Sequence, residues 1–164
     1  HCIPIDPFYL TWKAREFGIH PQFIELAGEI NASMPEWVVG KASEALAKKG
    51  KNMQGAKVLI LGVAYKKNVD DIRETPAFRI IELLQEKKAK VDYHDPYVQQ
   101  LHQTRQYDFQ MSSVDLSEET LAEYDLVIIV TDHDSLDYDL ILKSAKCIVD
   151  TRGRYRHNKT VVKA

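Results

Sequence analysis

The fold is decided by one stretch, Lys57-Val-Leu-Ile-Leu-Gly-Val63, a continuous apolar run of strand length. Apolar runs without alternation are typical of a strand that is covered on both faces, as in a parallel sheet. The run therefore predicts the buried first strand of an α/β domain that begins at about residue 55.

Helical and strand-like segments alternate from this run to the carboxyl end. We expect a helix over 75–88, with Pro76 in its first turn, and a strand over 90–94 that Asp95-Pro96 closes. The remaining expected segments are a helix near 98–103, a short strand near 109–111, a helix over 117–123, a strand over 126–130, a helix over 136–144 and a strand over 147–149. Such alternation predicts right-handed crossovers and a Rossmann-like, doubly wound parallel sheet.

The amino-terminal third is helical. A turn-rich start leads into a helix from Phe8 that ends at Gly18, and the longest helical pattern runs over 21–49. Pro35 interrupts this pattern and indicates either one bent helix or two abutting helices. We therefore divide the chain into a central helical segment, 1–54, and an α/β domain, 55–164.

The composition is that of a globular chain, with 45% hydrophobic and 28% charged residues among 164. A formal charge of -2 and the lack of a basic track argue against nucleic acid. No window approaches the roughly 18 apolar residues of a membrane span, and two distant cysteines form no disulfide framework. We expect a cytoplasmic protein without a membrane partner. Because the chain starts at His1 rather than Met, within a proline-rich turn, we also expect a piece of a longer protein.

The loop after the first strand, 62–75, is the first candidate site. It holds one glycine rather than GxGxxG, so its backbone is not expected to wrap a pyrophosphate. Any phosphate would be held by cationic side chains, and Lys66, Lys67 and Arg73 are available, the last just before a helix amino end. The alternative is that these are solvated loop charges, paired with Asp70, Asp71 and Glu74.

Cys2 and Asp6 are the second candidate site. A thiolate is a strong nucleophile, and a carboxylate four residues later could activate water for a hydrolysis step. The alternative is an inert terminal cysteine.

Three further clusters have weaker claims. Asp132-His133-Asp134 is a poor metal site because adjacent loop residues rarely converge on one ion, and we expect no metal. Asp150-Thr151-Arg152 follows the last expected strand, and either faces a ligand or forms a structural ion pair. His94-Asp95-Pro96 stands where dinucleotide folds place a ribose-binding acid, but it is also a good turn.

The two candidate sites together resemble one family. The segment from His1 to Leu10 resembles the catalytic cysteine segment of the UDP-glucose/GDP-mannose dehydrogenases, and Gly62 to Glu74 resembles their motif G-x-x-[FY]-K-x(5 or 6)-R. The resemblance implies oxidation of a sugar C6 alcohol to a carboxylate with two NAD+. It implies that Cys2 captures the aldehyde as a thiohemiacetal that becomes a thioester, which Asp6 helps to hydrolyse. It further implies that Tyr65 and Lys66 contact the UDP-sugar and Arg73 reaches NAD, while the long helix forms a homodimer.

The residues around the cysteine resemble those of the bacterial UDP-N-acetylglucosamine and UDP-N-acetylmannosamine 6-dehydrogenases, a branch of the family that serves polysaccharide biosynthesis. Ile5 stands where UDP-glucose enzymes typically have lysine. The alternatives are a UDP-glucose 6-dehydrogenase and a non-catalytic nucleotide-binding or dimerisation module. The family's amino-terminal NAD domain is absent from these residues, so we expect this chain alone to show no NAD-dependent turnover.

Overall fold

The structure is a computed structural model that describes residues 5–156 and 158–164. Its parallel sheet has the strand order β2-β1-β3-β4-β5. The strands are β1 (Lys57–Leu61), β2 (Lys90–His94), β3 (Leu126–Ile129), β4 (Ile148–Asp150) and β5 (Val161–Lys163). The helices are α1 (Asp6–Arg15), α2 (Gln22–Ala47), α3 (Pro76–Glu86), α4 (Glu118–Glu123) and α5 (Tyr138–Ser144). This is the α/β fold that the alternating pattern predicts.

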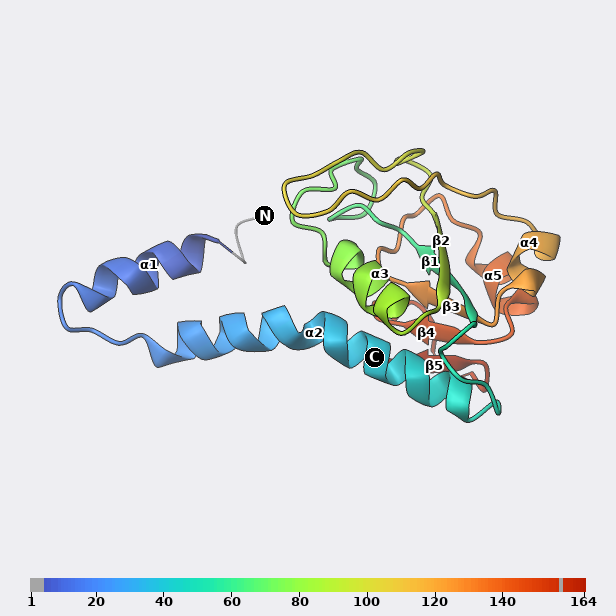
Figure 1. Ribbon diagram of the computed structural model, residues 1–164, viewed down its shortest axis with the longest axis horizontal. Helices are drawn as coiled ribbons and strands as arrows, with labels where there is room; N and C mark the ends of the chain where they lie inside the picture. Colours follow the sequence, from blue (N-terminus) through green and yellow to red (C-terminus); the bar gives the residue numbers. More distant parts are fainter. Residues whose placement is uncertain (1–4, 157) are drawn as a thin grey trace.

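The sheet lies between two helical layers because both of its faces are apolar. Val58 and Ile60 of β1 belong to one core cluster with α3 and the second half of α2. Leu59 and Leu61 point the other way, into a cluster with α4 and α5. Figure 1 shows α3 on one side of the strands and α4 and α5 on the other. The continuous apolar run of β1 is thus explained by burial on both faces.

β1 lies between β2 and β3, so the direction of winding reverses beside it. In open α/β sheets, ligands bind outside the carboxyl ends of the strands at such a switch point. The loops that follow β1, β2 and β3 are therefore the place to look for a site.

Most predicted elements are confirmed, two are wrong, and one strand of the structure was not predicted. The helix expected near 98–103 and the strand expected near 109–111 are wrong, because these residues are irregular apart from one isolated bridge of Gln100 with Ser112. The backbone N–H groups of Tyr97 and Val98 donate to the Asp95 carboxylate instead of starting a helix. The sequence pattern also missed β5, whose apolar signal is only Val161 and Val162, and which pairs with β4 at the sheet edge.

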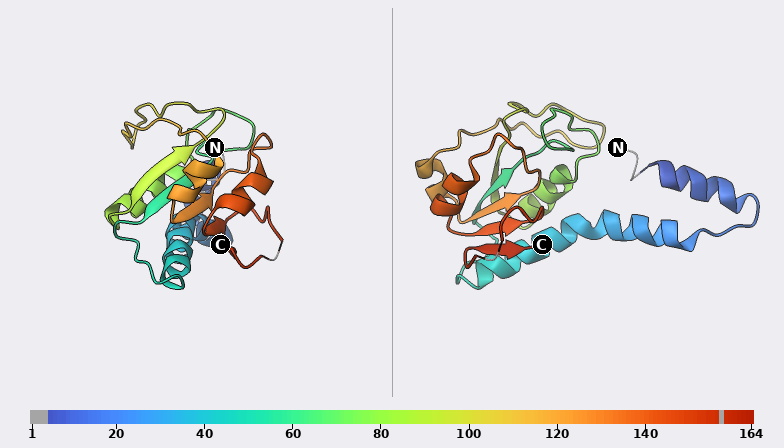
Figure 2. Two further views of the ribbon diagram at one scale, coloured as in Figure 1. Left: turned by 90° about the vertical axis from the view of Figure 1, so that its right-hand side faces the viewer. Right: turned by 180° about the vertical axis from the view of Figure 1, so that it is seen from behind.

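The helices α1 and α2 form an arm. α2 is one continuous helix through Pro35, and its buried residues all lie at or after that proline. The first half therefore leaves the domain and runs beside α1, as Figure 2 shows from behind. Phe8 of α1 packs on Gly28, where an added Cβ would lie 2.2 Å from the Phe8 ring.

Large apolar side chains are exposed along this arm, among them Trp12, Phe23 and Trp37. In the described part of the chain, no helix combines the length and the apolar character needed to cross a membrane.

Gly62 provides the first prediction. Its φ is +79°, and an added Cβ would lie 2.2 Å from the Thr131 carbonyl oxygen, a backbone atom that would have to shift. We expect Gly62→Ala to lower the free energy of unfolding by about 3 kcal/mol, because the new methyl group forces the β1 and β3 loops apart.

Urea unfolding followed by circular dichroism measures this change. Gly40→Ala is the matched control, since Gly40 is helical and nothing lies within 4 Å of its added Cβ. It should be neutral or stabilising by up to about 1 kcal/mol. Equal effects of the two substitutions would contradict the proposed close contact.

Candidate functional site

The crevice at the switch point is closed in this chain. The backbone N–H groups of Val130 and Thr131 both donate to the Leu61 carbonyl, at 2.9 and 3.1 Å. The Thr131 hydroxyl donates to the Ala64 carbonyl at 2.7 Å. The β1 and β3 loops are therefore bonded to each other where a dinucleotide fold leaves space for a pyrophosphate. The described residues do not form a dinucleotide pocket at this crevice.

A buried carboxylate holds the loops at this edge together. The side chain of Asp95 is fully buried. One oxygen accepts from the backbone N–H groups of Val63 and Ala64, at 2.7 and 3.1 Å, and the other accepts from those of Tyr97 and Val98, at 2.9 and 3.1 Å. Asp95 thus anchors the β1 loop and the β2 loop at once. These bonds leave it unavailable for a ribose, so the turn interpretation is right.

His133 adds the loop after β3 to this network. Its Nε2 lies 3.0 Å from Asp95 Oδ2, and its Nδ1 accepts from the backbone N–H of Asn68 at 2.9 Å. Because Nδ1 is an acceptor, the ring proton sits on Nε2 and points at the carboxylate.

Burial by itself would raise the pKa of the Asp95 carboxyl. The hydrogen bonds from His133 and from the backbone N–H groups outweigh burial and hold the pKa below its ordinary value. Asp95 is therefore ionised at neutral pH.

The neighbours of His133 do not converge on a metal position. His133 points into the interior, whereas Asp134 faces outward and bonds Lys67 and Asn68. No cluster of three or more potential metal ligands occurs in residues 5–156 and 158–164.

The cations of the β1 loop differ in their partners. Lys67 pairs with Asp134 at 3.3 Å, and Arg73 pairs with both carboxylate oxygens of Asp71, at 2.8 and 3.0 Å. Within the described part of the chain, Lys66 has no carboxylate at ion-pair distance and is exposed. The alternative of charges paired within the loop thus holds for Arg73, which bonds Asp71, whereas Lys67 pairs with Asp134 of the β3 loop. Lys66 is the loop lysine without an ion pair in the described residues.

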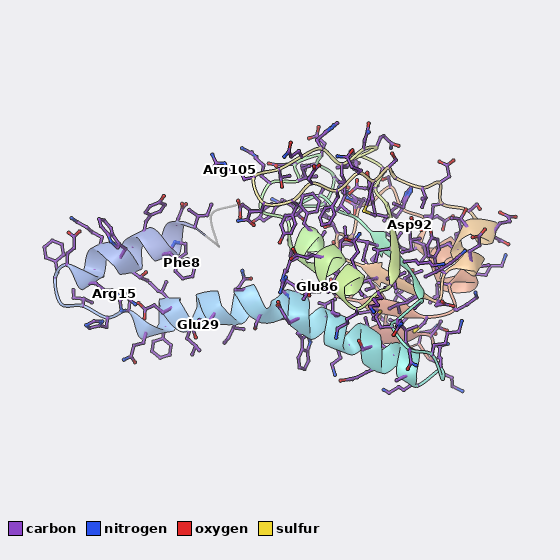
Figure 3. All side chains as sticks on the ribbon, in the orientation of Figure 1. Phe8, Arg15, Glu29, Glu86, Asp92 and Arg105 are labelled. Carbon is purple, nitrogen blue, oxygen red and sulfur yellow. The ribbon has the colours of Figure 1, made fainter. Side chains whose placement is uncertain are left out.

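A groove of about 980 Å³ lies beside this loop, between the domain and the start of the arm. Ile5 and Arg73 both line it, together with Arg79, Arg105 and Tyr107. Figure 3 shows Arg105 at the side of the domain nearest α1. The groove brings the segment just after the cysteine and the end of the β1 loop to one cavity.

The predicted site residues that the structure describes occupy three places. Arg73 lines the groove, and Asp6 begins α1 and lines an adjacent apolar hollow between α1 and α2. Tyr65 and Lys66 lie outside the groove lining, on the part of the loop next to the β3 loop. Cys2 falls outside the described residues.

Sequence reasoning missed two features. It weighed His133 only as a metal ligand, although its place after an apolar strand at the switch point could have indicated a role in holding the loops. It also did not predict that Arg79 and Arg105 line one groove, because nothing in the sequence around either residue indicates that the two lie close together.

Comparisons with known proteins point to one family. Residues 59–157 match the model of the UDP-glucose/GDP-mannose dehydrogenase family, UDP binding domain. The UDP-N-acetyl-D-glucosamine 6-dehydrogenase of Salmonella typhi is 35% identical over 133 residues, which are 81% of this chain and 30% of that protein.

Two solved structures are similar over almost the whole chain. The UDP-D-ManNAc dehydrogenase of Pyrococcus horikoshii has a TM-score of 0.80 at 30% identity, covering 99% of this chain and 37% of that one. A UDP-glucose dehydrogenase of Pyrobaculum islandicum has a TM-score of 0.72 at 28% identity, covering 94% and 34%. The chain thus spans about a third of the length of these relatives.

Asp95 provides the second prediction. Its pKa is lowered in the folded state, so its stabilisation is present above the ordinary pKa of about 3.9 and is lost as pH falls through the folded value. We expect Asp95→Asn to lower the free energy of unfolding by about 3 kcal/mol at pH 7, and this difference from wild type to shrink below about pH 4.

Urea unfolding at a series of pH values tests this. Asp115→Asn serves as control because Asp115 is exposed, and it should leave the free energy of unfolding at pH 7 unchanged. A difference between Asp95→Asn and wild type that stays constant down to pH 3 would argue against an ionised, hydrogen-bonded carboxylate.

Proposed function

Because the chain belongs to the UDP-glucose/GDP-mannose dehydrogenase family, we propose that it is the carboxy-terminal part of a nucleotide-sugar 6-dehydrogenase. The reaction is the oxidation of the C6 alcohol of a UDP-N-acetylhexosamine to a carboxylate with two NAD+. The observation that carries the proposal is the groove that Ile5 and Arg73 share, since Ile5 follows Cys2 by three positions in the sequence and Arg73 lies at the end of the β1 loop.

Lys66 and Tyr65 are proposed to bind the UDP part of the substrate. Lys66 offers an exposed ammonium without an ion pair in the described residues, at the carboxyl edge of the sheet. Such a group can make charge-assisted hydrogen bonds to phosphate oxygens. Tyr65 is half-buried beside it, and its backbone N–H donates to the Asp71 carbonyl at 2.7 Å, which orients this part of the loop.

Cys2 is proposed to carry the covalent chemistry. Its sulfur adds to the C6 aldehyde and gives a thiohemiacetal, so the aldehyde is not released, and oxidation of this adduct leaves a thioester. Asp6 then activates the water that hydrolyses the thioester to the carboxylate and the free thiol. This chemistry needs a reduced cysteine, which is the state that the cytoplasm maintains, so we place the reaction there.

NAD+ is proposed to bind mainly to a domain outside these residues. The closed crevice between β1 and β3 supports this, because Thr131 occupies the space beside Gly62. Arg73 is the one residue of this chain that we propose as a contact to NAD, since it is exposed and lines the groove.

The substrate is proposed to be a UDP-N-acetylhexosamine, as in the names of the Salmonella typhi and Pyrococcus horikoshii relatives. Ile5 lines the groove with an apolar side chain, where UDP-glucose enzymes typically have lysine. UDP-glucose is the second candidate, favoured by the similarity to the Pyrobaculum islandicum structure.

The arm is proposed to form a homodimer, in keeping with a division of the chain into a central helical segment, 1–54, and a UDP-sugar-binding domain, 55–164. Apolar side chains such as Phe23, Ile30 and Trp37 are exposed along α2. Exposed apolar surface of this extent is typical of an interface. A non-catalytic dimerisation module would share this property, and the presence of Ile5 in the groove lining, three positions after Cys2, favours the enzyme.

Binding of UDP provides the third prediction. We expect Lys66→Ala to weaken UDP binding by about tenfold or more, because one charge-assisted hydrogen bond to phosphate is lost. Lys67→Ala is the matched control, since Lys67 is already paired with Asp134, and it should change the affinity by less than about threefold.

Isothermal titration calorimetry of both variants with UDP gives the comparison. Equal affinities of Lys66→Ala and the wild-type chain would remove Lys66 from the site.

The fourth prediction concerns Cys2 in the full-length enzyme. We expect Cys2→Ser to stop formation of the uronic acid, because a serine hydroxyl is not ionised at neutral pH and is a far poorer nucleophile than a thiolate. The assay is mass spectrometry of the products from UDP-N-acetylglucosamine, UDP-N-acetylmannosamine and UDP-glucose. Unimpaired carboxylate formation by the variant would exclude Cys2 from the mechanism, and preference for UDP-glucose would exclude the hexosamine assignment.

A further inference from the structure

We propose that His133 is a positioning residue that holds the β1 loop so that Lys66 faces the ligand. The inference rests on the proposed binding of UDP by Lys66. It goes beyond that binding because it assigns a role to Asn68, which lies within the family motif, and to His133 and Asp134, which lie outside it. We call these three residues the loop clasp.

The clasp fixes the far end of the segment that carries Lys66. Asp95 holds the near end, through the backbone N–H groups of Val63 and Ala64. His133 holds the far end, through the backbone N–H of Asn68 at 2.9 Å. Tyr65, Lys66 and Lys67 lie between these two anchors. Because His133 and Asp95 are bonded to each other at 3.0 Å, both anchors belong to one buried network.

Asp134 binds the same residue from the outside. Its carboxylate accepts from Asn68 Nδ2 at 2.6 Å, and its backbone N–H donates to Asn68 Oδ1 at 3.0 Å. Two successive residues of the β3 loop thus bond Asn68, one to its backbone and one to its side chain.

Asn68 has an unusual backbone conformation. Its φ is +63°, in the left-handed region, which asparagine tolerates better than most residues other than glycine. The residue is exposed, so its conformation does not serve core packing. At Asn68 the conformation turns the chain immediately after the two lysines.

The clasp also determines which lysine is available. Asp134 pairs with Lys67 at 3.3 Å while it holds Asn68. Lys66 has no such partner in residues 5–156 and 158–164. The ring of Tyr97 covers His133 with a centroid distance of 5.0 Å, which keeps water from this side of the imidazole.

A double-mutant cycle on UDP binding tests the proposal. His133→Phe keeps the ring volume but removes both hydrogen bonds, and we expect it to weaken UDP binding by about tenfold. In the Lys66→Ala background the same substitution should change the affinity by less than about twofold, because the clasp acts through Lys66. His133→Gln offers one acceptor and one donor on its amide and should restore most of the affinity.

Asn68→Ala provides a second test on an exposed residue, where loss of folding is not expected. It removes both bonds to Asp134 and disfavours the positive φ, so it should weaken UDP binding in the same direction. If His133→Phe does not fold, this variant decides. His20→Phe on the exposed turn between α1 and α2 is the control for the ring exchange and should bind UDP like wild type.

Two outcomes would overturn the proposal while leaving Lys66 as the UDP ligand. One is wild-type affinity of His133→Phe and Asn68→Ala alongside weak binding by Lys66→Ala. The other is an effect of the same size with and without Lys66, which would mean that the clasp only stabilises the fold. Wild-type affinity of Lys66→Ala would instead overturn the proposed function itself.

Discussion

The buried Asp95 carboxylate is the interaction on which the edge of this sheet depends. Removing a charged carboxylate from water is costly unless hydrogen bonds replace its hydration. Here the donors come from the loops after β1, β2 and β3. The carboxylate therefore keeps all its hydrogen bonds only while these three loops keep their positions. A movement of any of these loops would leave the buried carboxylate without a donor, which is unfavourable. The buried charge thus restricts the positions of the loops more strictly than apolar packing alone would.

The carboxyl edge of the sheet also distinguishes this domain from dinucleotide-binding domains of similar topology. Thr131 bonds across the crevice beside Gly62, so the backbone there is used to join two loops rather than to bind phosphate. A ligand at this edge has to be held by side chains that extend from the loops. The proposed UDP site accordingly uses the side chains of Tyr65 and Lys66, and the loop after β1 has no further glycines.

The arm and the domain are joined by more than a linker. The second half of α2 belongs to the core that covers β1 and β3, and Arg79 of α3 bonds Glu36 at the point where α2 leaves the domain. The 26-residue helix α2 therefore fixes where α1 lies relative to the sheet. The groove between Ile5 and Arg73 depends on this connection.

The sequence alone determined the α/β class, the limits of the stronger elements and the loop that carries Tyr65, Lys66 and Arg73, because apolar periodicity and glycine content are local properties. It did not determine β5, whose two valines are too short a signal, or the irregular path over 98–111, where Asp95 captures the backbone N–H groups that a helix would use. The partners of each loop charge were equally out of reach. Lys67 lies 67 positions from Asp134, and Asn68 lies 65 from His133, so only the folded chain decides that Lys66 is the lysine without an ion pair in the described residues.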